Sequence, residues 1–471
     1  MSTPRLSRRN FAAGLASLVA PLTPCQTRAA QATLTGDVAW PGDPLYDNGR
    51  HDFNSRFDRY PAGIVYCSDV ADAQNAILWA QAKKIPVSVR SGGHSYEAYS
   101  VLDDRLVIDL SGIAHVKVDH AGGSAAMGPG VRLLDLYRAL AAEGVAIAGG
   151  TCPGVGLGGL LLGGGIGFRS RRDGLTCDSL LSADVVLANG QVVHTSAREQ
   201  PDLFWALRGG GGGNVGIATS FTLRTTPAED VAMASITWPW DQAAPVIAAW
   251  QAWAPHTDPR LSSSLAVFRP DSGVIGFTGV LLGAVDELEA LLGPLLATGS
   301  PAPHLRTLSW LEAAEELAGP GGEHAAFKNG SAFAYRPLPP DAIAMVVDQM
   351  SKAPAPANLI SFFALGGAIS GIAPGATAFP HRRALFDLQI QAYWGEAWQE
   401  AENVAWVNGV RQALTPYTAG AYVNYIDADQ PDWPAAYYGR NLTRLMQVKA
   451  RYDPDNVFNG PQSIPVDADS D

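Results

Sequence analysis

The segment Gly149–Gly167, GGTCPGVGLGGLLLGGGIG, stands out in this chain of 471 residues because ten of its 19 residues are glycine. Glycine loses more conformational freedom on folding than any other residue. A run of glycines is therefore useful where the backbone must approach a neighbour closely or adopt a positive φ. The segment also holds one reactive side chain, Cys152. We interpret it as a loop that wraps a large, flat, anionic cofactor, with Cys152 in contact with that cofactor.

Residues 154–159 of this segment match G-x-G-x-x-G, the fingerprint of Rossmann dinucleotide-binding units. The fingerprint requires a helix to begin there, so that its N-terminus meets the pyrophosphate. The residues that follow, Leu-Leu-Leu-Gly-Gly-Gly-Ile-Gly, are not expected to start a stable helix. The sequence therefore favours a cradle of backbone N–H groups outside the Rossmann fold.

Two further glycine-rich stretches bear on the same ligand. Arg208–Asn214 is either a flexible hairpin connection or a second tight backbone site, and His94 follows Gly92 and Gly93 after a predicted strand. A lone histidine is usually structural, but His94 and Cys152 are both nucleophiles beside glycine backbone, which suggests one ligand held from two sides. One histidine and one cysteine on separate loops fall short of a four-ligand metal site. The sequence contains no G-x-S-x-G elbow for hydrolysis.

Composition limits the classes of function. Hydrophobic residues make up 47% of the chain and charged residues 17%, as in an ordered globular protein, and the length favours two domains. The net charge of −12 provides no basic excess to meet nucleic-acid phosphates. No internal apolar run reaches the roughly 18–20 residues that a membrane span needs.

The N-terminus, residues 1–32, is interpreted as a twin-arginine export signal. Arg8 and Arg9 precede an apolar, alanine-rich run, and Ala30-Gln-Ala32 offers a cleavage site between small residues. An ordinary secretory signal is the alternative. The prediction is a secreted or periplasmic bacterial protein that uses the twin-arginine export machinery. Cys67 and Cys177 either form a disulfide or are two buried thiols.

The pattern of short strands and few long helices up to Thr226 suggests an α+β domain. Within it, Ser68–Lys84 reads as a helix capped by Ser68. The character changes at Pro227–Asp230, after which alternating strands and helices predict one antiparallel sheet with helices as a separate domain on the substrate side. In that domain Phe386–Ala392 reads as a strand and Val285–Ala297 as a helix.

A tyrosine pair lies near the C-terminus, in Tyr422-Val-Asn424-Tyr425-Ile-Asp427. The pKa of an unperturbed tyrosine is near 10, so it acts as a base only where its neighbours lower that value. From these residues alone, two core tyrosines with satisfied hydroxyls are the more common arrangement.

Together these motifs resemble the berberine bridge enzyme-like flavoproteins of the vanillyl-alcohol oxidase superfamily. The resemblance covers about residues 40–465 and rests on Arg90–Ser100, Gly150–Gly156, Phe379–Arg382 and Tyr437–Phe458. It implies a two-domain α+β flavoprotein with a PCMH-type FAD-binding domain at 45–228 and an antiparallel-sheet substrate-binding domain at 229–420. A C-terminal segment at 421–465 would complete the FAD domain.

The resemblance further implies bicovalent FAD. In the family, the matching histidine bonds the 8α-methyl group of the flavin and the matching cysteine bonds C6; here these positions are His94 and Cys152. The other implied cofactor-binding residues are Arg90, Ser91, Gly92, Gly93, Ser95, Gly150, Thr151, Gly154, Gly156, Gly158, Gly159, Gly213, Asn214, Tyr422 and Asn424.

The implied reaction removes a hydroxyl proton and transfers a hydride to flavin N5, with O2 as the acceptor that yields H2O2. Plant members carry a carboxylate where this chain has Gly371, which favours a tyrosine base: Tyr425 first and Tyr422 second. Gln389 and Gln391 would face the flavin from one strand. Tyr393 shares that face only if the strand continues past Ala392.

The implied substrate is a small molecule with an alcohol or hemiacetal carbon, such as a sugar, an oligosaccharide or a glycosylated metabolite. Oxidation of a polyketide secondary metabolite on the same fold is one alternative. A redox-silent secreted carbohydrate-binding protein is an alternative of a different class.

Overall fold

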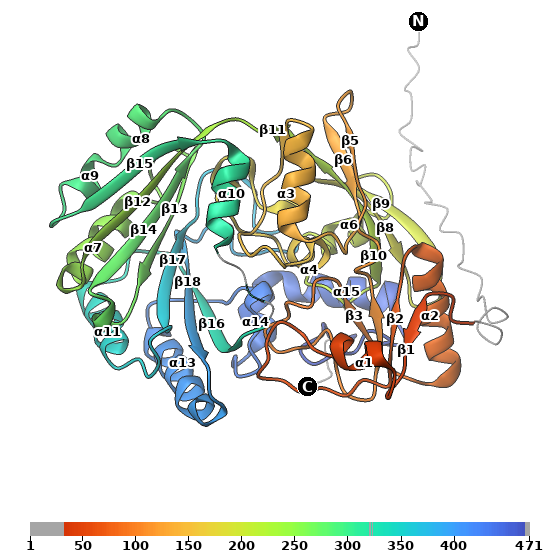
Figure 1. Cartoon of the computed structure of the whole chain (residues 1–471). Coiled ribbons are helices and arrows are strands. Elements are labelled where there is room, and N and C mark those ends of the chain that lie inside the picture. The colour runs from red at the N-terminus through yellow and green to blue at the C-terminus, as the bar shows by residue number, and fades with distance from the viewer. Residues whose placement is uncertain (1–32, 320–321, 323, 467–471) are drawn as a thin grey trace, which may run out of the picture.

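The computed structural model describes residues 33–319, 322 and 324–466, so the predicted signal segment lies outside the described residues (Figure 1). None of the helices in these ranges is long and apolar enough to cross a membrane.

Two larger sheets and the two-stranded sheet β11-β7 form the N-terminal part of the molecule, on the right of Figure 1. The first, in the order β1-β2-β4-β3, joins β2 and β3 parallel to β4, as the strand–helix–strand pattern predicts. The second, β5-β6-β10-β8-β9, is antiparallel throughout. The elements are β1 (Asp37–Ala39), α1 (Pro44–Gly49), β2 (Gly63–Tyr66), α2 (Val70–Lys83), β3 (Val87–Arg90), β4 (Leu106–Asp109), β5 (Val116–Asp119), β6 (Ser124–Met127), α3 (Leu133–Ala142), β7 (Val145–Ala146), α4 (Leu157–Leu162), α5 (Ser170–Asp173), β8 (Leu180–Val186), β9 (Val192–Ser196), α6 (Pro201–Ala206), β10 (Ile217–Arg224) and β11 (Thr226–Pro227).

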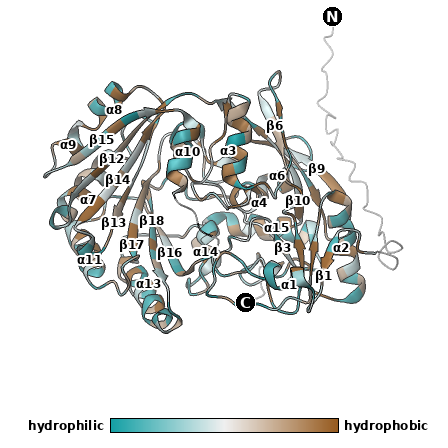
Figure 2. Ribbon diagram, viewed as in Figure 1, coloured by the Kyte–Doolittle hydropathy of each residue, from teal (hydrophilic) through white to brown (hydrophobic). Residues whose placement is uncertain are grey.

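A seven-stranded antiparallel sheet, in the order β15-β12-β14-β13-β17-β18-β16, forms the left part of Figure 1, with α7, α8, α9, α11 and α13 on its outer side. This confirms the predicted antiparallel sheet with helices. Figure 2 shows both hydrophilic and hydrophobic stretches on α13, as expected for a helix that buries one side. The elements are β12 (Val231–Pro239), α7 (Ala243–Trp253), β13 (Leu261–Val267), β14 (Val274–Leu281), α8 (Val285–Leu291), α9 (Gly293–Leu296), β15 (Ala302–Leu308), α10 (Trp310–Ala318), β16 (Ala326–Ala334), α11 (Pro340–Ser351), β17 (Leu359–Ala364), α12 (Ala368–Gly371), β18 (Phe386–Trp394) and α13 (Glu400–Leu414).

Strand alternation gives this sheet two different faces. Along β18, the side chains of Phe386, Leu388 and Ile390 are buried in the core beneath the outer helices. The side chains between them face the opposite side and line a cavity: Asp387, Gln389, Gln391 and Tyr393. The sheet therefore presents a row of polar groups toward the N-terminal part of the molecule.

The C-terminal helices α14 (Trp433–Tyr438) and α15 (Leu442–Tyr452) pack on the N-terminal part. The buried Lys449 Nζ donates to the Asn214 carbonyl at 2.8 Å and to the Phe458 carbonyl at 2.6 Å. The Tyr438 hydroxyl donates to the Gly210 carbonyl at 3.0 Å. These contacts fix the second glycine run and the chain end against one another.

The glycine segment differs from the sequence-based expectation because it does begin a helix, α4. Leu157, Leu161 and Leu162 are buried in the main core, and this packing compensates for the poor helix propensity of the glycines. The unit is still not a Rossmann βαβ element. The strand before it, β7, has two residues and pairs antiparallel with β11.

Three boundaries are also corrected. The cap of α2 is Asp69, whose side chain accepts from the Asp72 N–H, and not Ser68. The predicted helix Val285–Ala297 is two helices, α8 and α9, that meet at Leu292. Strand β18 continues to Trp394, which places Tyr393 on the face shared by Gln389 and Gln391. Strands β15 and β16 and helix α10 were not predicted.

Candidate functional site

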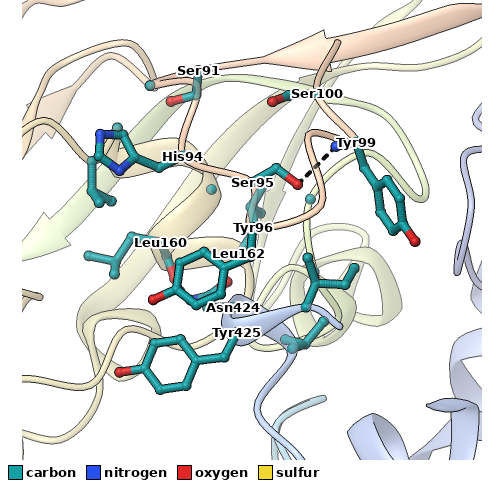
Figure 3. Close-up of a pocket in the computed structure, with 18 of the residues that line it drawn as sticks. Ser91, His94, Ser95, Tyr96, Tyr99, Ser100, Leu160, Leu162, Asn424 and Tyr425 are labelled. Atoms are coloured by element: carbon teal, nitrogen blue, oxygen red, sulfur yellow. Dashed lines mark hydrogen bonds between the residues drawn. The ribbon is translucent and has the colours of Figure 1, made fainter. Parts of the chain in front are cut away.

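A cavity of about 520 Å³ lies where the two glycine runs, the His94 loop, the polar face of the sheet and the C-terminal segment meet (Figure 3). This volume is within the usual range for small-molecule and cofactor sites. The cavity brings together most of the residues that the sequence singled out, although they come from distant parts of the chain.

Some glycines allow the loops to pack backbone against backbone. A Cβ atom on Gly92 would overlap the backbone of Gly156, and a Cβ on Gly156 would overlap Gly92 and the Ser91 hydroxyl. A Cβ on Gly154 would lie 2.8 Å from His94 Nε2. The absence of side chains at these three positions therefore lets the His94 loop contact the Cys152 loop closely, which explains why both loops need glycine there.

Other glycines keep the cavity itself open. A Cβ atom on Gly159 or Gly213 would meet no protein atom within 4 Å, yet both residues line the cavity. Among the described residues that line it, none is lysine or arginine, so an anionic ligand would be met by backbone N–H groups and hydroxyls. A glycine cradle of this kind fits the phosphates and flat ring of FAD.

His94 is held in a defined orientation at this cavity. Its ring stacks on Phe53, with centroids 4.4 Å apart and planes 15° apart. Burial, with smaller effects from Arg132 and His324, lowers the pKa of His94 to about 4. The imidazole is therefore neutral at ordinary pH, and one of its ring nitrogens retains the lone pair that a nucleophile needs.

Cys152 lines the same cavity and is accessible to solvent. The protein around it nevertheless raises the pKa of the thiol through burial, so the group is protonated here. Three tyrosines, Tyr96, Tyr393 and Tyr425, line the same cavity as Cys152. Cys67 and Cys177 are both free and lie buried in different cores, so the predicted alternative of two buried thiols is confirmed.

Tyr425 lies at the cavity with its ring stacked on Tyr96, as Figure 3 shows. Burial raises its pKa well above 10, and the nearby Asp387 carboxylate raises it further. Burial also raises the pKa of Asp387 to about 8, and one oxygen of that carboxylate, Oδ1, is buried without a hydrogen-bond partner. Asp387 is thus the carboxyl group at the cavity whose pKa is close to neutral pH, where a proton-transfer group works best.

The two glutamines differ in how their hydrogen bonds are used. Gln391 donates to the Ser361 hydroxyl at 2.9 Å and accepts from the Tyr393 hydroxyl at 3.4 Å. Gln389 donates to the Tyr96 hydroxyl at 3.0 Å. Within the part of the chain that the structure describes, the Oε1 atom of Gln389 accepts no hydrogen bond, so it is an acceptor that this pair leaves for a bound molecule.

Tyr422 binds the glycine-rich segment Gly149–Gly167 through its hydroxyl. Its hydroxyl accepts from the Gly165 N–H at 2.8 Å and from Asn424 Nδ2 at 2.9 Å, and Asn424 also donates to the Leu160 carbonyl. Burial raises the pKa of Tyr422. Both residues thus hold the glycine segment in place while they line the cavity.

Two residues predicted from the sequence lie off the cavity surface. The Arg90 guanidinium is buried against the Asp109 carboxylate and the Gly49 carbonyl, where it joins β3 to β4 and to the end of α1. Gly154 lies so close to the His94 ring that a Cβ atom on it would be 2.8 Å from Nε2. The predicted residues that do line the cavity, besides those described above, are Ser91, Gly92, Gly93, Ser95, Gly150, Thr151, Gly156, Gly158 and Asn214.

The sequence interpretation did not select several residues that line the cavity. Asp387 was missed although alternation along β18 places it beside Gln389, and a lone carboxylate in an apolar strand was the available signal. Tyr96 lies within a quoted motif but was not selected. The chain end, Phe458–Ser463, also lines the cavity. Gly371, which the sequence resemblance matched to a carboxylate of plant members, is not among the described residues that line the cavity.

Comparisons with known proteins place this geometry in a family. A family model described as "FAD binding domain" matches residues 61–196, and one described as "Berberine and berberine like" matches residues 421–465. An uncharacterized FAD-linked oxidoreductase of Bacillus subtilis, YgaK, is 40% identical over 92% of this chain and 97% of its own length.

Two solved structures are also similar. The berberine bridge enzyme-like protein 1 of Physcomitrella patens has a TM-score of 0.87 and 32% identity, over 92% of this chain and 98% of that one. Xylooligosaccharide oxidase from Myceliophthora thermophila, solved with xylobiose, has a TM-score of 0.85 and 30% identity, over 91% of this chain and 97% of that one.

Proposed function

The chain belongs to the berberine bridge enzyme-like family of FAD-linked oxidoreductases, and we propose on that basis that it oxidises an alcohol or hemiacetal carbon of a sugar or oligosaccharide. The observation that carries the proposal is the position of Asp387 and Tyr425. They lie together on the wall of the cavity that also holds His94 and Cys152.

His94 and Cys152 are the proposed attachment points of the cofactor. The neutral imidazole of His94 and the cavity-facing thiol of Cys152 support two covalent bonds to FAD. Bound FAD would supply the acceptor for the two electrons of the substrate and pass them to O2, which leaves as H2O2. Gly159 and Gly213 would allow its close approach.

Asp387 and Tyr425 are proposed to remove the substrate hydroxyl proton together. A tyrosine whose pKa is raised above 10 stays protonated at ordinary pH and does not take up the proton by itself, whereas the Asp387 carboxyl group, with a pKa of about 8, is ionised above that pH and can then accept it. The Tyr425 hydroxyl would contact the substrate hydroxyl, and the proton would come to rest on Asp387. The hydrogen on the alcohol carbon would leave with its electron pair to the two-electron acceptor that bound FAD supplies, and the carbon would become a carbonyl.

The proposed substrate class follows from the character of the sheet face. Gln389, Gln391, Ser361 and Ser264 are uncharged hydrogen-bonding groups that line the same cavity as Tyr425. Sugars present neutral hydroxyls and apolar ring faces, which such groups and aromatic rings can bind. The similarity to an oxidase named for xylooligosaccharides supports the same class.

Export is proposed from the sequence alone. Residues 1–32 carry the twin-arginine pattern, and this route is used for proteins that fold before they cross the membrane. A secreted or periplasmic oxidase would meet sugars and O2 outside the cytoplasm.

The experiment is a screen of purified protein with monosaccharides, oligosaccharides and small alcohols for release of H2O2. We expect a yellow protein that forms peroxide with at least one sugar. A yellow protein that forms peroxide only with a polyketide glycoside would shift the substrate to secondary metabolites. A colourless protein that binds sugars would instead be a carbohydrate-binding protein that has kept the fold.

A further inference from the structure

A buried lysine joins the two loops that carry the stacked tyrosines. Lys328 lies on β16, and its side chain is 1% exposed. Its Nζ atom lies 2.6 Å from Glu97 Oε1, 2.6 Å from Asp427 Oδ1 and 3.2 Å from Asp429 Oδ2. Burial opposes the charge on Lys328, but Asp427 and Glu97 outweigh that effect and raise its pKa, so the residue remains a cation.

The two carboxylates are neighbours of the tyrosines in the chain. Glu97 directly follows Tyr96, and Asp427 is two residues after Tyr425. Tyr96 and Tyr425 line the cavity, whereas Glu97 and Asp427 are both buried away from it. Each loop therefore has one side at the reaction site and the other side bound to the same ammonium group.

The position of β16 explains why such a link is needed. β16 is an edge strand of the seven-stranded sheet, and within the described residues its outer edge is met by an isolated bridge, Phe333 to Ala419, in place of a further strand. On the other face of this strand from Lys328, the amide of Asn329 lies near the hydroxyls of Tyr96 and Tyr393. The loops thus meet the edge strand from two directions, and Lys328 is the point at which both are attached to it.

Neighbouring charges show that the cluster belongs to the interface between the loops and the sheet. Arg411 lies 3.4 Å from Asp427, and Arg56 lies 3.9 Å from Glu97 and 2.8 Å from Glu400. These arginines lie within ion-pair distance of the second oxygen of each carboxylate but form no hydrogen bond with it. Neither of them contacts both loops, whereas Lys328 does.

We propose that Lys328 is a positioning residue that sets the separation and stacking of Tyr96 and Tyr425, and thereby the place of the Tyr425 hydroxyl at the cavity. The inference rests on the proposed role of Tyr425 in proton removal. Its structural part, the geometry of the stacked rings, stands independently of any substrate.

A purely structural role predicts a different result from a positioning role. If Lys328 only neutralises buried carboxylates, the triple variant Glu97→Gln/Lys328→Met/Asp427→Asn removes the need for it and behaves as wild type, because neutral groups of similar shape can replace the buried part of the ion cluster. The third carboxylate, Asp429, is 43% exposed and keeps its hydrogen bond from Asn408. If Lys328 positions the tyrosines, the triple variant regains the melting temperature that Lys328→Met loses. It does not regain the ring geometry.

The test uses crystal structures of the holoenzyme and anaerobic reduction of its flavin by the sugar found in the peroxide screen. We expect the Tyr96–Tyr425 centroid distance in the triple variant to exceed the 5.4 Å of the wild type. We expect reduction to slow by roughly tenfold to hundredfold, the effect of a displacement of about 1 Å, with a smaller change in substrate affinity. An unchanged stack together with a wild-type reduction rate would overturn the proposal.

Single variants keep the test decisive if the triple variant does not fold. Glu97→Gln and Asp427→Asn each release one loop while Lys328 stays in place. Each is expected to slow reduction, and Lys328→Arg is expected to recover part of the rate lost in Lys328→Met. Wild-type rates in both single variants would overturn the proposal. If no sugar reduces the flavin of the wild type, the proposed function fails, and the ring geometry still tests this inference.

Discussion

The rings of Tyr96 and Tyr425 are stacked, with centroids 5.4 Å apart and planes 5° apart, although they come from opposite ends of the chain. Gln389, which lies on the sheet, donates to the Tyr96 hydroxyl and thereby fixes the Tyr96 ring of the pair. The stack therefore joins the His94 loop, the sheet and the C-terminal segment at one wall of the cavity. Tyr425 is positioned at that wall by contacts from all three.

Tyr425→Phe is expected to slow flavin reduction by about 10²–10⁴-fold, the usual effect of losing a group that transfers protons. The stacked ring is kept, so the fold should be unaffected. The measurement is the rate of flavin bleaching under anaerobic conditions after mixing with substrate.

Tyr422→Phe is the matched control. It removes the acceptor for the Gly165 N–H and Asn424, so it should lower stability by about 1–3 kcal/mol. Its effect on the rate should be smaller than that of Tyr425→Phe. The reverse order of the two rates would assign proton removal to Tyr422.

Asp387→Asn should remove a pH dependence from the reaction. The pKa of Asp387 is raised to about 8, so the carboxylate that accepts a proton is present mainly above that pH. In the wild type, flavin reduction should rise with pH up to about 8 and then level off. The variant should be slow and lack this rise, as measured by reduction rates from pH 5 to pH 10; an unchanged profile would remove Asp387 from the mechanism.

Asp387 should also affect stability in a defined direction. Between about pH 4 and pH 8 the folded protein retains a proton that the unfolded chain has released, so this group makes the fold less stable as pH rises through that window. Asp387→Asn should therefore raise the melting temperature more at pH 8 than at pH 4. Equal shifts at both pH values would contradict the raised pKa.

Gly159→Ala tests the cradle. The added methyl group would meet no protein atom, and the residue lies in a helix. The free energy of unfolding should therefore rise slightly, by up to about 1 kcal/mol. Because the methyl group enters the cavity, the ratio of flavin to protein in the purified sample should fall. Gly409→Ala, also in a helix with no atom within 4 Å but far from the cavity, should gain stability and keep its full flavin content. Equal flavin content in both variants would exclude Gly159 from the cofactor site.

Much of the site could be predicted from the sequence because its signals are local. Glycines that allow loops to touch, nucleophiles beside them and the alternation of Gln389 and Gln391 are visible in short stretches. The helix α4 could not be predicted in this way, since its stability comes from leucines that pack against distant elements and not from its own residues.

The long-range contacts were beyond the sequence. Lys328 in an apolar strand gave no sign of partners in two remote loops, and Arg90 was read as a cofactor residue when its partner is Asp109. Charged residues beside a binding motif can serve either the ligand or the scaffold, and only the fold decides between them. The pKa of Asp387 likewise depends on burial that no local pattern specifies.

The central claim is that His94 and Cys152 both hold the flavin, and peptide mass spectrometry of the purified yellow protein tests it most directly. After acid denaturation and proteolysis, we expect one cross-linked species in which the His94 and Cys152 peptides share a single flavin. Cys152→Ala should leave the flavin on the His94 peptide alone, with an altered absorption spectrum. Release of all the pigment into the acid supernatant, with both peptides unmodified, would contradict the account.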